Sequence, residues 1–174
     1  MQGIELGVEP ALMARALGAF GGTGRRFEDR GEADGVRVID DYAHHPTEIE
    51  ALLRTARGVA QERGGRVLVL FQPHLFSRTR AFADRFGQAL ALADAVVVTD
   101  VYPARETQAD FPDITGDTVA QRVPGGTARF VAERLDAAHA VVSRNERRTD
   151  KKLWTQNQGG VPILSMISSF QRPD

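Results

Sequence analysis

Two short polar runs contain most of the residues in this chain that could bind a charged ligand. The first, DDYAHHPTE, occupies residues 40–48, and the second, QPHLFSRTR, occupies residues 72–80. Each run follows an apolar segment typical of a β-strand and leads into a helical pattern. In an open parallel sheet, the carboxyl ends of neighbouring strands form the crevice in which ligands bind. We therefore interpret the two runs as one composite site for an anionic ligand.

In the first run, Asp41, His44 and His45 are candidate ligand-binding residues. A carboxylate at a strand end can accept hydrogen bonds from sugar hydroxyls or hold a magnesium ion. An isolated Asp pair more often ends a strand and caps a turn, so this alternative stays open for Asp40 and Asp41. The histidines precede a helix N-terminus, which favours anions. Alternatively, one histidine caps the helix and the other lies on the surface. Adjacent histidines rarely bind one ion, so we predict no zinc site.

In the second run, His74, Arg78 and Arg80 are the residues of interest. Arginine binds carboxylates and phosphates through two parallel hydrogen bonds. Cations at the start of a helix are unfavourable against the helix dipole, and an anionic ligand would account for them. We therefore predict a binding role for Arg78, while Arg80 fits either a binding role or an exposed position. Three residues at the next strand end, Asp100, Tyr102 and Glu106, we interpret as a polar rim.

Strands and helices alternate along the chain around these runs. The predicted elements are a helix at 10–20, a hairpin of strands 27–30 and 36–39, a helix from residue 46, a strand at 67–71, a helix over 82–93, a strand at 95–99, a surface loop at 102–112, a short helix at 116–123, a strand at 128–131 and a helix at 133–143. This order predicts an α/β fold, a Rossmann-like three-layer sandwich with a mostly parallel sheet that opens with a β-hairpin.

The last 31 positions, residues 144–174, differ in character from the rest. Residues 144–160 are polar and aperiodic, which is typical of a solvated loop or disorder. Residues 161–167 are apolar enough for a strand, but Pro162 restricts that strand to a sheet edge or places the proline at its start.

Composition excludes several classes of function. The net charge of −1 over 174 residues argues against nucleic-acid binding, and no apolar run reaches the length needed to span a membrane. The absence of Cys excludes disulfides and fits the reducing cytoplasm, where we expect the protein. No phosphate-loop motif occurs, nor does a glycine-rich dinucleotide fingerprint follow a strand. If the domain helps to use a nucleotide, the phosphate cradle must lie on another domain.

Taken together, these runs resemble the C-terminal domain of the Mur ligases, the ATP-dependent amino-acid ligases of peptidoglycan synthesis. The resemblance rests on RRFE at 25–28, VIDDYAHHPTE at 38–48, FQPH at 71–74 with SRTR at 77–80, and TDVY at 99–102. Residues 1–143 align in register, and the double-His run distinguishes the alanine-adding branch. One departure is Leu75, where the family often has Arg, so one carboxylate contact is absent or replaced.

The resemblance implies ligand contacts but no catalytic residue and no metal ligand in this domain. The implied ATP contacts are Arg26 and Asp41, and the implied amino-acid contacts are His44, His45, His74 and Arg78. Within these sets, Arg26 would contact the phosphates and Asp41 the ribose. His44 and Arg78 would hold L-alanine, with Arg78 on its carboxylate.

The resemblance also implies a three-domain, ATP-dependent carbon–nitrogen ligase. Such an enzyme joins UDP-N-acetylmuramate to L-alanine through an acyl-phosphate, and its central domain holds most contacts to ATP and magnesium. We expect residues 1–22 to be the end of that central domain, 23–143 the C-terminal domain, and 144–174 a divergent tail, disordered or frameshifted. This interpretation makes the chain a fragment that is inactive alone, unless a separate chain supplies the other domains.

Two alternatives come from other classes of protein. One is a stand-alone Rossmann-like module that binds a nucleotide or an amino acid. The other is a small hydrolase with His44 or His45 as base, although no matching nucleophile motif accompanies these residues.

Overall fold

The computed structural model describes residues 7, 9–19, 24–33, 35–146 and 163–167. Its centre is a six-stranded sheet with the strand order β1-β2-β6-β3-β4-β5. The only antiparallel pair among these strands is β1 with β2, and the other neighbours are parallel. The strands are β1 Glu28–Ala33, β2 Val36–Asp41, β3 Val67–Phe71, β4 Ala95–Val98, β5 Ala128–Phe130 and β6 Ile163–Ile167. The predicted opening hairpin and mostly parallel sheet are confirmed.

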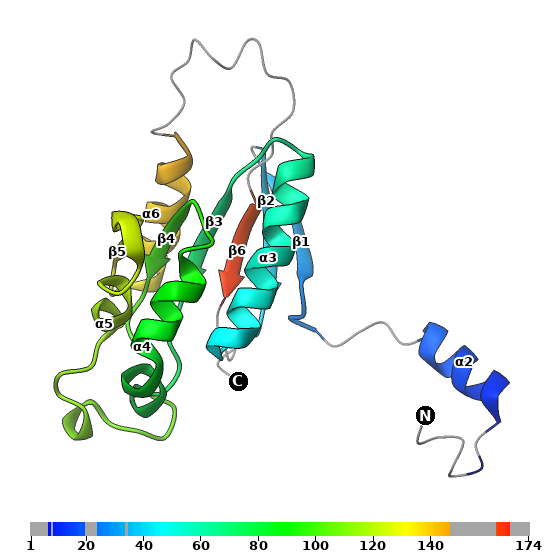
Figure 1. Ribbon diagram of the computed structural model, residues 1–174, viewed down its shortest axis with the longest axis horizontal. Coiled ribbons are helices and arrows are strands. Elements are labelled where there is room, and N and C mark those ends of the chain that lie inside the picture. Colours follow the sequence, from blue (N-terminus) through cyan, green and yellow to red (C-terminus); the bar gives the residue numbers. More distant parts are fainter. Residues whose placement is uncertain (1–6, 8, 20–23, 34, 147–162, 168–174) are drawn as a thin grey trace.

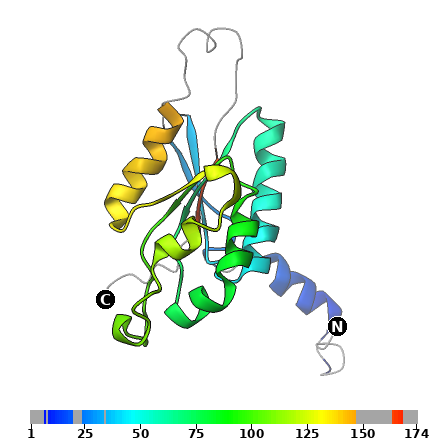
Figure 2. The ribbon, with the colours of Figure 1, turned by 60° about the vertical axis from the view of Figure 1, so that its left-hand side comes forward.

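Helices cover both faces of the sheet, which completes the predicted three-layer sandwich. The helices are α2 Pro10–Ala19, α3 Pro46–Glu62, α4 Phe76–Leu90, α5 Gly116–Ala120 and α6 Arg134–Glu146, with 3₁₀ turns at Gln108–Asp110 and Pro124–Gly126. Figure 1 shows α3 and α4 side by side in front of the strands, and the turned view of Figure 2 shows α6 on the opposite side. Among the described residues, no helix is both long and apolar enough to cross a membrane.

Strand β3 shows why a continuous apolar run becomes a central strand. All five of its residues are buried, because alternate side chains enter different cores. Val67, Val69 and Phe71 join the core under α3 and α4. Leu68 and Leu70 join the core under α6. Burial on both faces therefore replaces the alternation of polar and apolar residues that a half-exposed strand would show.

Strand β6 comes from the part of the chain that we expected to diverge. It begins directly after Pro162 and pairs in parallel with β2 on one side and β3 on the other. The strand is therefore central in the sheet and not at an edge. Residues 20–23, at the predicted boundary between the first two parts, and residues 147–162 and 168–174 lie outside the described residues, so the three-part division of the chain stays a prediction.

Candidate functional site

The carboxyl ends of the strands meet in register at one edge of the sheet. Asp41 of β2 pairs with Ile167 of β6, which also pairs with Phe71 of β3, and Phe71 in turn pairs with Val98 of β4. The runs at 40–48 and 72–80 begin at or just after these positions, so both emerge at the same edge. The structure therefore brings the two runs together at this edge, and the binding of an anionic ligand there stays a prediction.

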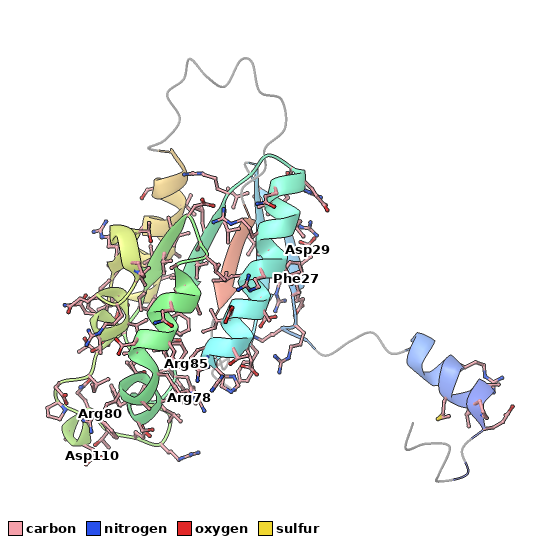
Figure 3. All side chains as sticks on the ribbon, viewed as in Figure 1. Phe27, Asp29, Arg78, Arg80, Arg85 and Asp110 are labelled. Atoms are coloured by element: carbon pink, nitrogen blue, oxygen red, sulfur yellow. The ribbon has the colours of Figure 1, made fainter. Side chains whose placement is uncertain are left out.

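Four side chains from three strand ends form what we call the histidine–arginine cluster: His44, His74, Arg78 and Tyr102. The rings of His44 and His74 have centroids 6.4 Å apart, and His74 stacks on Tyr102 at 5.6 Å. Nη1 of Arg78 lies 3.4 Å from Nδ1 of His74. Figure 3 shows Arg78 near the beginning of α4. The cluster combines one cation with imidazole groups, a set suited to a carboxylate or phosphate.

The backbone locks the two strand ends of this cluster together. The amide of Tyr102 donates to the carbonyl of Pro73 (2.8 Å), and the amide of Leu75 donates to the carbonyl of Tyr102 (2.9 Å). His74 and Tyr102 thereby form a short parallel bridge beyond β3 and β4. The interpretation of Tyr102 as polar rim was therefore incomplete, because its ring is one wall of the cluster.

Arg78 determines which nitrogen of His74 carries a proton. A guanidinium group has only donors, so Nδ1 of His74 must accept, and the remaining N–H is on Nε2. Burial, followed by the charges of Arg78 and His44, lowers the pKa of His74 below its ordinary value of 6.5. His74 is thus a neutral ring at pH 7, and it can donate one hydrogen bond from Nε2 to an anionic ligand.

Arg26 and Asp41 line a second feature, an open pocket of about 410 Å³. Its other lining residues are Phe27, Glu48, Ala51, Leu52 and Thr55. Asp41 is buried, and its two oxygens accept hydrogen bonds from the amides of Ala43 (2.7 Å) and Phe27 (2.8 Å). The turn-capping role considered for Asp41 therefore exists in the structure. Each carboxylate oxygen retains a second acceptor position, so the same residue can also bind a ligand hydroxyl.

Glu48 joins the pocket to the histidine–arginine cluster. One of its oxygens, Oε2, accepts from the amides of His44 (3.0 Å) and His45 (3.1 Å), and the side chain also lines the pocket. Burial alone would raise the pKa of Glu48, but these hydrogen bonds, together with the charges of His44 and Arg26, lower it. Sequence reasoning missed this residue. The available signal was a Glu three positions after the helix cap, the pattern of a capping box.

His45 does not join the cluster. It is the N-cap of α3: its Nδ1 accepts from the amide of Thr47 (3.4 Å), and its ring packs edge-on against Phe82 at 5.0 Å. The alternative in which one of the two histidines caps the helix therefore describes His45. His44 is the histidine that turns toward His74, with its own Nδ1 3.0 Å from the carbonyl of Tyr42.

The loop after β4 packs against α4 instead of lying loosely on the surface. Phe111 stacks on Phe76 at 5.8 Å, and the guanidinium of Arg80 lies 4.7 Å from the centre of the Phe111 ring. Arg80 also pairs with Asp113 at 3.2 Å. Figure 3 shows Arg80 next to the loop that carries Asp110. These contacts give Arg80 a structural task, so a ligand is not needed to account for its charge.

Within the described part of the chain, no group of three or more His, Asp or Glu side chains is arranged to hold a metal ion.

Comparisons with known proteins agree on one family. Residues 25–151 match the family described as "Mur ligase, glutamate ligase domain". The UDP-N-acetylmuramate–L-alanine ligase of Kineococcus radiotolerans is 61% identical over 137 residues, which are 78% of this chain and 28% of that protein. The enzyme of the same name from Saccharopolyspora erythraea is 56% identical over 164 residues, 94% of this chain and 33% of that protein.

Solved structures give the same result. The crystal structure of the UDP-N-acetylmuramate–alanine ligase of Thermotoga maritima superposes with a TM-score of 0.60 at 28% identity, covering 98% of this chain and 32% of that one. The chain thus spans about a third or less of the length of the relatives that it matches.

Proposed function

Because the chain belongs to the Mur ligase family as its C-terminal domain, we propose that it supplies the ATP- and amino-acid-contacting surface of an ATP-dependent UDP-N-acetylmuramate–L-alanine ligase. The observation that carries the proposal is the in-register meeting of the strand ends. It places an open pocket with an arginine and a carboxylate beside a cluster with an arginine and two histidines, and Glu48 contacts both.

The open pocket fits a nucleotide. Its volume of about 410 Å³ falls within the range of ordinary ligand sites. Arg26 offers a guanidinium to phosphate oxygens, and Asp41 has acceptor capacity left for a ribose hydroxyl. When bound, ATP activates the acceptor carboxylate. We assign magnesium, and most contacts to the phosphates, to a central domain of the kind found in the family.

The histidine–arginine cluster suits the incoming amino acid. In our proposal, Arg78 binds the carboxylate of L-alanine through parallel hydrogen bonds, and His74 donates from Nε2. His44 completes the wall on the side that faces the nucleotide pocket. His45 supports the site only indirectly, through the cap of α3. The cytoplasmic location expected from the sequence goes with this role and stays a prediction.

A chimeric ligase tests these assignments. In it, the 137-residue segment matched in the Kineococcus enzyme is exchanged for that of this chain. We expect Arg78→Ala to raise the KM for L-alanine by about 10- to 100-fold, the effect of losing hydrogen bonds to a charged group, without changing the KM for ATP. Arg26→Ala should raise the KM for ATP and leave the KM for L-alanine unchanged.

Arg54→Ala is the matched control, because Arg54 is an exposed arginine that pairs only along α3 with Glu50 in the contacts that the structure describes. It should leave both constants unchanged. An unaltered KM for L-alanine in the Arg78→Ala enzyme would refute the assignment of the amino-acid site. If the unsubstituted chimera had no activity at all, the stand-alone binding module would gain support, to be tested by titrating the 174-residue chain with ATP.

A further inference from the structure

Helix α4, which carries Arg78, begins without a cap of its own. Its N-cap position is Leu75, whose side chain makes no capping hydrogen bond and whose backbone adopts a φ of 69°. The first amides of a helix have no partner within the helix, so they need acceptors from elsewhere. Since this turn also precedes Arg78 directly, whatever satisfies those amides also fixes where Arg78 points.

Glu106 supplies the missing cap from a distant part of the chain. Its Oε2 accepts a hydrogen bond from the amide of Ser77 (2.9 Å), and its Oε1 accepts one from the Ser77 hydroxyl. The two residues are 29 positions apart, and Glu106 lies in the loop after β4. A carboxylate at this position also opposes the positive end of the helix dipole.

We propose that Glu106 is a positioning residue for amino-acid binding, an inference that rests on the function proposed above. By capping α4 from the β4–α5 loop, Glu106 holds Arg78 and His74 toward the carboxylate of the ligand. Arg78 lies in the first turn of α4, and its Nη1 contacts Nδ1 of His74, just before the helix, at 3.4 Å. The backbone bridge to Tyr102 holds His74, so a shift in the first turn of α4 would move Arg78 away from it and break this contact.

Glu106 also decides which donors remain for the ligand. A helix N-terminus attracts any carboxylate. By engaging both the amide and the hydroxyl of Ser77, Glu106 removes these donors and leaves Arg78 and His74 to the substrate. Burial alone would raise the pKa of Glu106, but the hydrogen bonds from Ser77 and Phe76 and the charge of Arg105 lower it, so the cap is ionised at pH 7.

A second anchor on the same loop allows the positioning role to be separated from simple loop packing. This anchor is the contact of Arg80 with Phe111 and Asp113, which touches neither Ser77 nor the first amides of α4. Asp113→Ala weakens the loop through this anchor alone and leaves the cap intact. It is therefore the matched control for Glu106→Ala.

The test uses the chimeric ligase with Glu106→Ala, Glu106→Gln and Asp113→Ala. For Glu106→Ala we expect the KM for L-alanine to rise by between about 3- and 30-fold, the range for loss of a helix cap, with the KM for ATP unchanged. Glu106→Gln keeps a neutral acceptor and should lie between Glu106→Ala and the parent. Asp113→Ala should leave the KM for L-alanine as it is. In the 174-residue chain, hydrogen exchange at the Ser77 amide should quicken in Glu106→Ala and not in Asp113→Ala.

An equal rise in the KM for L-alanine in Glu106→Ala and Asp113→Ala would overturn the proposal, because the packing of the whole loop, and not the cap, would then control amino-acid binding. An unchanged KM in Glu106→Ala, in a chimera where Arg78→Ala raises it, would also overturn it while leaving the proposed function intact. If Arg78→Ala has no effect either, the amino-acid site itself is wrong. Should Glu106→Ala fail to fold, as judged by its thermal unfolding, the isosteric Glu106→Gln decides by the same criteria.

Discussion

At the scale of single residues, His74 and Arg78 constrain each other's chemistry. Burial and, after it, the guanidinium keep the imidazole neutral, because protonation of Nδ1 would charge a partly buried ring and place two cations 3.4 Å apart. The neutral ring in turn fixes the direction of the guanidinium. Each therefore prepares the other for one anionic ligand, and neither could be replaced by a residue of similar charge without loss of this coupling.

The lowered pKa of His74 predicts a contribution to stability that depends on pH. The unfolded chain binds a proton near the ordinary value of 6.5, whereas the folded chain binds it only at lower pH. The native state is therefore favoured above pH 6.5, and this contribution is lost as the pH falls toward the folded pKa. We expect His74→Asn to flatten the decline in the midpoint of thermal unfolding between about pH 7 and about pH 5.

His139→Asn serves as the comparison for this measurement, since His139 is an exposed residue on α6, away from Arg78. Its midpoint curve should run parallel to that of the parent chain. A His74→Asn curve that is also parallel to the parent would show that burial and Arg78 do not hold the ring neutral.

The two adjacent histidines illustrate what sequence could and could not predict about the site. Residue types and spacing nominated both His44 and His45, and also named a cap as the alternative for one of them. The backbone at the start of α3 determines which histidine caps the helix and which joins the cluster. There, His45 accepts from the amide of Thr47 and packs against Phe82 of another helix. That contact joins residues far apart in the chain, so no local pattern contains it.

At the scale of elements, α4 and the turn that follows α5 approach so closely that α4 requires a glycine at position 87. A Cβ built on Gly87 would lie 2.2 Å from the backbone oxygen of Arg122 and 2.5 Å from its carbonyl carbon. Since backbone atoms cannot move aside cheaply, we expect Gly87→Ala to lower the free energy of unfolding by about 1–3 kcal/mol, the usual cost of overpacking. Urea unfolding of the chain measures this difference.

Gly58 provides the opposite case within α3. It is exposed, and a Cβ at this position would meet nothing within 4 Å. Gly58→Ala should therefore raise the free energy of unfolding by about 0.5–1 kcal/mol through helix propensity alone. A Gly87→Ala chain as stable as Gly58→Ala would mean that the turn after α5, which carries Arg122, does not lie where the structure places it.

Local patterns predicted most elements because burial and turn chemistry act over short distances. The unbroken apolar runs became β3 and β4, and Pro46 opens α3 as its position indicated. The packing of the loop at 102–112 was the feature that the sequence predicted least well, because we expected a surface loop and the structure packs it against α4. The loop has no period of its own, and its order comes from Phe76 and Arg80 on α4, which the chain reaches only by folding back.

At the scale of the whole molecule, the strand order is what sequence reasoning left undetermined. Each strand could be recognised alone, but the order β1-β2-β6-β3-β4-β5 depends on pairing between segments more than a hundred positions apart. The consequence for function is direct. β6 lies between the strand that leads to Asp41 and the strand that leads to His74, so it sets the spacing between the nucleotide pocket and the histidine–arginine cluster.

The central position of β6 predicts that the chain depends on this strand for its stability. Ser165 pairs with Ile39 on one side and Val69 on the other. Proline at this position removes an N–H that faces a neighbouring strand, and its ring does not fit inside a sheet. We therefore expect Ser165→Pro to cost roughly 3 kcal/mol or more of unfolding free energy. Ser165→Ala keeps the N–H and should remain close to the parent in urea unfolding. If Ser165→Pro matched Ser165→Ala, β2 and β3 would have to pair without β6, and the two halves of the proposed site would lie one strand closer together.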